Sequence, residues 1–89
     1  MAISFDKFKK IFLYDCIGEC CIEARLVFDG NYFFVGKSAD NTYWSGAPYT
    51  FETADFNKFC EFIESMWVGI EVVDIDGCEP SERIDFYLK

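Results

Sequence analysis

The sequence predicts a single small α+β domain over residues 1–89, with the element order α-β-β-β-α-β-β, two helices and a mostly antiparallel sheet of four to five strands. Two segments carry apolar residues at helical spacing, while several others alternate apolar and polar residues as strands do. Turn signals separate these segments at short intervals. The chain has 89 residues, 52% hydrophobic and 20% aromatic, which is enough for one core and leads us to expect no second domain.

The first expected element is a helix over residues 4–15. Ser4 is a suitable N-cap because its hydroxyl can accept a hydrogen bond from the first helical turn. The residues that recur at helical spacing after it are Phe5, Phe8, Ile11 and Phe12. Gly18 is a residue type that ends helices, so the helix is not expected to continue beyond it.

A β-hairpin is expected next. Apolar and polar residues alternate over residues 22–28, which predicts a half-buried strand. Asp29 and Gly30 form a strong turn signal, and residues 32–35 predict the returning strand. Aromatic residues of both parities in that returning strand predict that it is covered on both faces.

A third strand is expected over residues 42–45. It is followed by a Gly-Ala-Pro interruption before residues 49–51. Because proline cannot donate a backbone hydrogen bond, Pro48 places this segment at a sheet edge or in a loop.

The second helix is expected over residues 54–67, where apolar residues form a stripe at helical spacing and Thr53 is the predicted N-cap. A strand over residues 70–75 follows. Its apolar parity slips at Val72–Val73, which indicates a bulge or burial on both faces. Alternation over residues 83–89 predicts a final strand.

The charge balance argues against several classes of function. Lys and Arg number 8 against 16 Asp and Glu, so the formal net charge is −8. This argues against direct binding of nucleic acid through its phosphates and against electrostatic binding to a membrane surface. The chain has no His, the usual proton-transfer group at neutral pH. With no imidazole base and no glycine-rich phosphate loop, we expect neither enzymatic activity nor a cofactor.

The five cysteines show no regular metal-binding pattern. Cys16, Cys20 and Cys21 are clustered, and Cys60 and Cys78 are isolated. Zinc hooks usually contain pairs of cysteines with two residues between them. The acidic residues beside the cluster raise thiol pKa values, which disfavours redox reactivity. We expect free structural thiols, no bound metal and, in the absence of a leader or membrane segment, a cytoplasmic location.

Acidic residues concentrate in the second half of the chain. Between positions 71 and 85, six carboxylates are opposed only by Arg83, and two more lie on the polar side of the second predicted helix. A field of this kind steers association with a basic partner. The acidic candidates for partner binding are Glu61, Glu64, Glu71, Asp74, Asp76, Glu79, Glu82 and Asp85.

An aromatic segment adds a second candidate binding surface. Tyr43, Trp44 and Tyr49 are large amphipathic side chains of the kind that anchor protein interfaces. Core packing is the alternative for each of them. The polar residues beside Trp44, and the Gly-Ala-Pro sequence just after it, favour an exposed position on a loop or an edge strand.

We therefore expect a non-enzymatic inhibitor that masks a basic, nucleic-acid-binding surface of a target protein. In its size, acidity and aromatic content the chain resembles small acidic inhibitors encoded by phages and mobile elements, such as anti-CRISPR and other DNA-mimic proteins. That resemblance implies that Asp74, Asp76, Glu79 and Glu82 stand in for phosphates in a nucleic-acid channel. The alternatives are an immunity protein that neutralises a basic nuclease toxin, an accessory subunit of an assembly, and a small metal or redox domain built on the clustered thiols.

Overall fold

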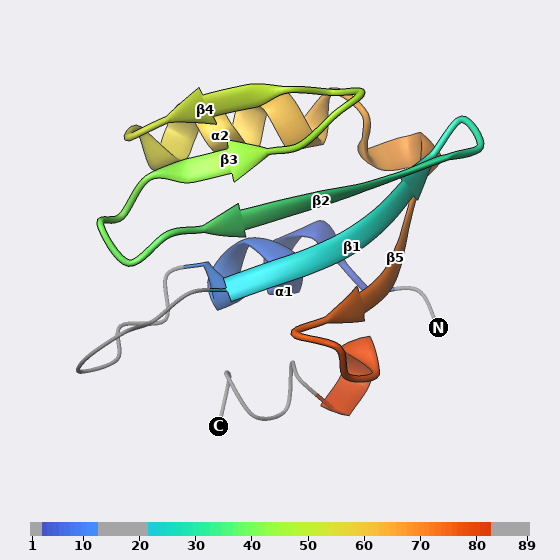
Figure 1. Cartoon of the computed structure of the whole chain (residues 1–89). Helices are drawn as coiled ribbons and strands as arrows, with labels where there is room; N and C mark the ends of the chain where they lie inside the picture. Colours follow the sequence, from blue (N-terminus) through green and yellow to red (C-terminus); the bar gives the residue numbers. More distant parts are fainter. Residues whose placement is uncertain (1–2, 13–21, 83–89) are drawn as a thin grey trace.

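The computed structural model of this chain describes residues 3–12 and 22–82, which form a five-stranded antiparallel sheet with helices on one side (Figure 1). The elements are α1 (Phe5–Ile11), β1 (Ile22–Phe28), β2 (Asn31–Lys37), β3 (Tyr43–Ser45), β4 (Phe51–Thr53), α2 (Phe56–Glu64), the 3-10 turn η1 (Trp67–Gly69) and β5 (Ile70–Ile75). The strands lie in the order β4-β3-β2-β1-β5, each antiparallel to its neighbours. The predicted α+β class is confirmed.

The β1–β2 hairpin forms the middle of the sheet, as predicted. Asp29 and Gly30 both have positive φ, 50° and 78°, which is the conformation of a tight turn that matches the twist of the two strands. Leu26 lies opposite Phe33 in the register, and both are buried. The even-numbered residues of β1 and the odd-numbered residues of β2 therefore share the core side of the sheet.

The expectation that the second hairpin strand is covered on both faces is wrong. Tyr32 and Phe34 in β2 are 65% and 43% exposed. Both point away from the helices, because their parity is opposite to that of buried Phe33. The three consecutive aromatic residues of this strand thus lie on two different surfaces, Phe33 in the core and the other two on the opposite side.

Strands β3 and β4 extend the sheet from β2 to one edge. The predicted third strand is confirmed, and a strand that was not predicted, β4, pairs with it. Pro48 lies in the connecting loop after a cis peptide bond, in agreement with the loop expectation. The sequence predicted only one strand here because the two paired segments are three residues long each.

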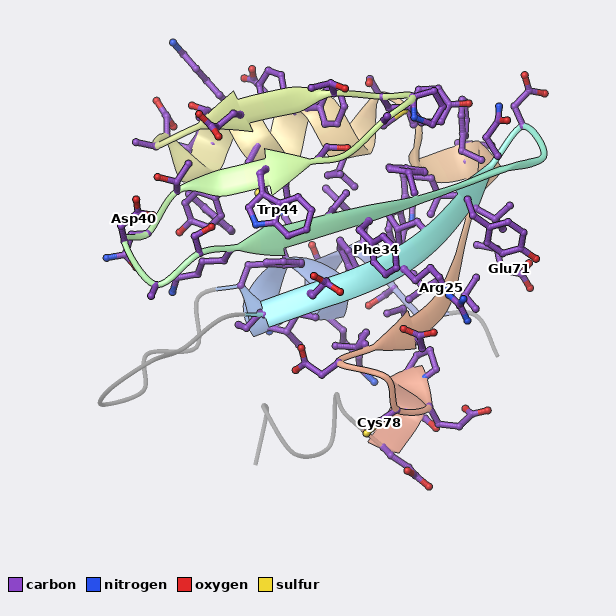
Figure 2. All side chains as sticks on the ribbon, viewed as in Figure 1. Arg25, Phe34, Asp40, Trp44, Glu71 and Cys78 are labelled. Atoms are coloured by element: carbon purple, nitrogen blue, oxygen red, sulfur yellow. The ribbon has the colours of Figure 1, made fainter. Side chains whose placement is uncertain are left out.

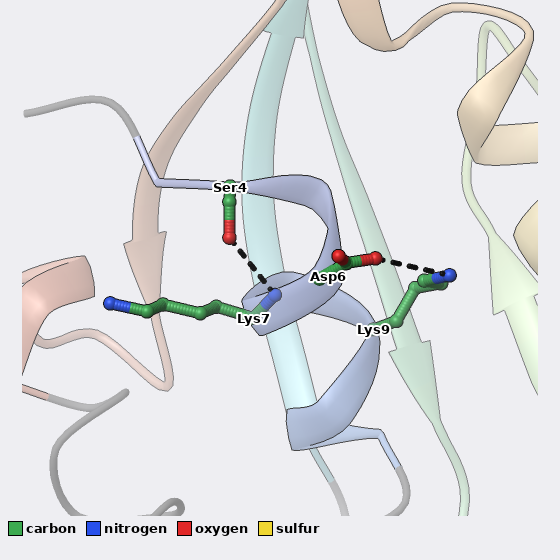
Figure 3. A network of polar contacts seen from close by, with 4 residues as sticks. All are labelled: Ser4, Asp6, Lys7 and Lys9. Atoms are coloured by element: carbon green, nitrogen blue, oxygen red, sulfur yellow. Dashed lines mark hydrogen bonds and ion pairs between the residues drawn. The ribbon is translucent and has the colours of Figure 1, made fainter.

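Helix α1 begins where the sequence predicts. The Ser4 hydroxyl accepts a hydrogen bond from the backbone N–H of Lys7 at 3.2 Å, which caps the helix (Figure 3). On the exposed side, Lys9 and Asp6 form an ion pair at 3.5 Å (Figure 3). The helix ends at Ile11, and residues 13–15 of the predicted helix lie outside the described part of the chain.

Helix α2 begins later and ends earlier than predicted. Its N-cap is Asp55, whose carboxylate accepts hydrogen bonds from the backbone N–H groups of residues 57 and 58. Thr53, the predicted N-cap, lies two residues too early and accepts a hydrogen bond from the N–H of Asp55. The helix ends at Glu64, and Trp67 belongs to η1.

Strand β5 closes the other edge of the sheet beside β1. The register shifts between Arg25 and Leu26, whose partners are Asp74 and Val72. Val73 is the extra residue, so of the two predicted alternatives the bulge is the one that the structure confirms. The chain passes from the β4 edge to the β5 edge through α2 and η1, on the side of the sheet that α1 also covers (Figure 1).

The core lies between the helices and that side of the sheet. Phe12 packs against Phe8 and Phe59 with ring centroids 5.1 and 5.3 Å apart, and Phe59 stacks on Tyr43 at 5.3 Å. The buried hydrophobic residues are Phe8, Ile11, Phe12, Ile22, Ala24, Leu26, Phe33, Val35, Tyr43, Phe59, Ile63 and Ile75. Every strand residue in this set points to the helix side of the sheet, so the alternate residues of the strands point to the other side.

Several expectations fall on residues outside the described ranges. These are the cluster of Cys16, Cys20 and Cys21, the strand predicted over residues 83–89 and the candidate Asp85. Within the described ranges, no helix has the length and apolar character needed to cross a membrane.

Candidate functional site

The side of the sheet opposite the core carries large side chains that none of the described helices covers, and we call it the open face. Figure 2 shows Trp44, Phe34 and Arg25 on this side, in front of the strands. Strand register assigns its members: Glu23, Arg25, Val27, Tyr32, Phe34, Gly36, Trp44, Glu52, Glu71 and Asp74. The open face is thus formed by alternate residues of all the described strands, which run antiparallel to one another.

Aromatic rings occupy the middle of the open face. Trp44 is half-buried and lies over Gly36 of the neighbouring strand, since a Cβ built on Gly36 would be 2.6 Å from its Cζ2 atom. Phe34 and Tyr32 follow along the same strand and are exposed. Exposed aromatic rings of this size on the surface of a sheet are typical of protein-binding surfaces.

A guanidinium on the open face is already engaged within the chain. Arg25 forms an ion pair with Asp74 at 2.9 Å, and the two residues are register partners on β1 and β5. The Arg25 guanidinium also lies over the Tyr32 ring, 5.9 Å from its centroid. Asp74 therefore balances the positive charge of Arg25.

The remaining charged residues of the open face are carboxylates. Glu23, Glu52 and Glu71 are exposed, and among the residues described none of them has an ion-pair partner. Together with Asp74 they oppose only Arg25, so the strands present a negative field around the aromatic rings. Each of the three lies on a different strand: β1, β4 and β5.

The structure does not gather the predicted acidic candidates into one cluster. Glu71 and Asp74 are on the open face, whereas Glu61 and Glu64 are exposed on α2, on the other side of the sheet. Opposite sides of a sheet cannot contact one flat partner surface at the same time. The acidic half of the sequence is therefore divided between two surfaces.

The acidic residues after β5 do not lie together on one surface. Asp76 Oδ1 accepts a hydrogen bond from the backbone N–H of Glu23 at 3.0 Å, which ties the turn to β1. Glu79 and Glu82 are exposed beyond that turn, while Asp85 lies outside the described residues. Of the four residues proposed to stand in for phosphates, Asp74 and Asp76 thus have internal partners.

The three aromatic candidates also separate. Tyr43 is 8% exposed and belongs to the core, where burial raises the pKa of its hydroxyl and the nearby Cys60 raises it further. Tyr49 packs against Phe28 and Phe33, and its hydroxyl donates a hydrogen bond to the Phe28 carbonyl oxygen at 3.2 Å. Trp44 alone of the three lies on the open face, in a paired strand rather than in a loop.

Sequence reasoning missed Phe34, Tyr32 and the carboxylates of Glu23 and Glu52 as surface candidates. The signal was available in the hairpin register. Glu23 and Arg25 alternate with buried residues in β1, so their side of that strand faces solvent, and a two-residue turn pairs them with the even-numbered residues of β2.

Two of the cysteines lie in the described part of the chain. Cys60 and Cys78 are half-buried and are not in disulfides. Burial raises the pKa of the Cys60 thiol; Lys9 lowers it and Glu64 raises it. Within residues 3–12 and 22–82, no group of three or more His, Cys, Asp or Glu side chains is placed to hold a metal ion.

The open face is therefore the best-defined candidate site: an aromatic centre, a neutralised Arg25–Asp74 pair and three exposed carboxylates. Aromatic rings and carboxylates of this kind are side chains that take part in protein–protein contacts. Comparisons of the chain with protein families, with curated proteins and with solved structures find no match.

Proposed function

We propose that this chain is a non-enzymatic inhibitor that binds a basic, nucleic-acid-binding surface of a target protein through its open face. The observation that carries the proposal is the combination of exposed aromatic rings with four carboxylates against one guanidinium on a single side of the sheet. A few residues, often Trp, Tyr or Arg, supply most of the binding energy at protein interfaces, while complementary charge directs the encounter.

The sign of the charge selects the class of partner. A second copy of the chain would bring Glu23, Glu52 and Glu71 against the same carboxylates, and like charges in an interface are unfavourable. Nucleic acid would be repelled in the same way. A protein surface rich in Lys and Arg, of the kind that binds nucleic acid, is complementary to the open face.

Site-specific photo-crosslinking tests this function. We would replace Phe34 with p-benzoylphenylalanine in one variant and Glu64, on the opposite side of the molecule, in a second. Each variant would be expressed in the cells that naturally carry the gene. We expect a partner to be captured from position 34 and not from position 64. Capture from position 64 alone, or from neither position, would contradict the proposal.

The captured partner would then be purified and its binding to nucleic acid measured. We expect the wild-type chain to compete with nucleic acid, Glu71→Lys to weaken competition, and Glu61→Lys, with the same charge change on α2, to leave it unchanged. A partner whose nucleic-acid binding is undisturbed would argue against inhibition by masking. A defence effector as partner would indicate an anti-CRISPR-like role, and a nuclease toxin an immunity role.

The association rate should also depend on salt. Between about 0.01 M and 0.15 M salt the screening length falls from about 30 Å to about 8 Å. Association steered by the carboxylates of the open face should therefore slow over this range, whereas dissociation should change less. An association rate that does not respond to salt would count against charge complementarity.

A further inference from the structure

One row of residues crosses the open face from β4 to β1. Glu52 is the register partner of Trp44, Trp44 of Gly36, and Gly36 of Glu23. Because Gly36 has no side chain, the indole of Trp44 lies across its strand, toward the strand that carries Glu23. The row therefore places one large ring between two carboxylates (Figure 2 shows Trp44 in front of the sheet).

Neither carboxylate of this row has a positive partner among the residues that the structure describes. In the described ranges the ion pairs are Lys9 with Asp6 and Arg25 with Asp74, and neither involves Glu52 or Glu23. The two glutamates are exposed. The ring and the two carboxylates thus form a set that attracts a cation and contains none.

The adjacent part of the open face holds a guanidinium in a comparable set of residues. There Arg25 lies over the ring of Tyr32, 5.9 Å from its centroid, and forms an ion pair with Asp74 at 2.9 Å. That arrangement comprises an aromatic ring, a carboxylate and a guanidinium. The Trp44 row repeats the ring and the carboxylates, and no guanidinium of the described residues is paired with them.

We propose that Trp44, Glu52 and Glu23 form a binding site for an arginine side chain of the partner, an inference that rests on the proposed function of the open face. A planar guanidinium stacks on an indole more favourably than an ammonium does, and its five N–H donors can reach carboxylates on either side of the ring. The site selects arginine over lysine for these two reasons.

A titration with small peptides tests the site on the intact chain. The probe is the blocked tripeptide acetyl-Gly-Arg-Gly-amide, and the readout is the NMR signal of each indole N–H group. Trp67 is an internal control because it packs against Phe5 and Phe8. We expect the Trp44 signal to shift and that of Trp67 to stay. The lysine peptide should bind more weakly, and the citrulline peptide, uncharged and of similar shape, should not bind.

Charge-neutral variants identify the carboxylates. Glu52→Gln and Glu23→Gln should each weaken binding of the arginine peptide by about two- to fivefold, as expected for exposed ion pairs. Glu64→Gln, which removes the same charge from α2, should leave binding unchanged. Trp44→Ala, in which binding is followed by the backbone N–H signals of β2 and β3 because the responding indole is gone, should abolish the selectivity for arginine over lysine. The unchanged Trp67 signal would show that this variant is folded.

The outcomes separate this inference from the proposed function. If Glu64→Gln weakens peptide binding as much as Glu52→Gln does, or if the Trp44 signal does not respond, the arginine site is wrong. Crosslinking from position 34 would still stand in that case. If the Trp44 signal responds selectively but position 34 captures no partner, the arginine site is upheld and the proposed inhibitor function fails.

Discussion

The indole of Trp44 and the Cα of Gly36 lie so close on neighbouring strands that position 36 has no room for a side chain. A Cβ added to Gly36 would lie 2.6 Å from Trp44 Cζ2 and 2.5 Å from the carbonyl oxygen of Ile22. Cβ contacts below 3.0 Å essentially never occur in proteins. The glycine is therefore required by packing, and it allows the indole to lie across the strand.

Gly36→Ala should lower the free energy of unfolding by about 1–3 kcal/mol, because the added methyl group overpacks the sheet. Urea denaturation measures this. In the double variant with Trp44→Ala only part of the loss should be recovered, since the contact with the Ile22 backbone remains. Wild-type stability in the single variant would contradict the packing of Trp44 on Gly36.

Tyr49→Phe should destabilise the chain by about 1 kcal/mol, the usual value for hydrogen bonds lost from a partly buried group. The Tyr49 hydroxyl donates to the Phe28 carbonyl oxygen and accepts from Asn31 Nδ2, both at 3.2 Å. These bonds fasten the loop after β3 to the β1–β2 turn. Thermal melting compares the variant with Tyr32→Phe, whose tyrosine is 65% exposed and should tolerate the change.

Asp55→Ala should cost about 1 kcal/mol of stability, because the N-cap of α2 loses its acceptor for two backbone N–H groups. Asp55→Asn retains a side-chain oxygen and should cost much less. Chemical denaturation of the two variants separates capping from simple loss of charge. Equal destabilisation by both would show that the carboxylate acts through its charge and not as a cap.

Alkaline pH should destabilise the chain. Burial raises the pKa values of Tyr43 and Cys60 in the folded state, so above about pH 9 the unfolded chain releases protons that the folded chain retains. The stabilising contribution is thus complete at lower pH and is lost as the pH rises. The free energy of unfolding, measured from about pH 8 to 11, should fall less steeply in the Tyr43→Phe, Cys60→Ser double variant. Identical pH profiles would rule these two groups out as the source.

Much of the fold follows from local patterns. The start of α1 at Ser4, the Asp29-Gly30 turn and the bulge at Val73 were predicted because each depends on residues close in sequence. The N-cap of α2 was misplaced by two residues, because Thr53 and Asp55 are both suitable caps and only the backbone geometry selects between them. Strand β4 was missed because a three-residue strand has too little periodicity to detect.

The candidate site was less predictable. The sequence identified Trp44, Glu71 and Asp74, but it also grouped them with Glu61 and Glu64, which are close in sequence and lie on the other side of the sheet. Residues that are close in sequence lie apart in space when a helix packs on one side of the sheet and the strand after it points its side chains to the other side. Asp74 illustrates this, since its partner Arg25 lies far away in the sequence.

The sequence by itself determined the α+β class, the acidity and the alternation that gives each strand two different sides, because these properties reside in composition and in local spacing. Only the tertiary structure decided that α1 and α2 cover the same side of the sheet and that Trp44 comes to lie on Gly36 between Glu52 and Glu23. Those relationships depend on register between strands and on where the helices pack. The strand register and the helix positions are both set by burial of the shared core. The local pattern of a strand does not specify which of the strand's two faces that core will cover.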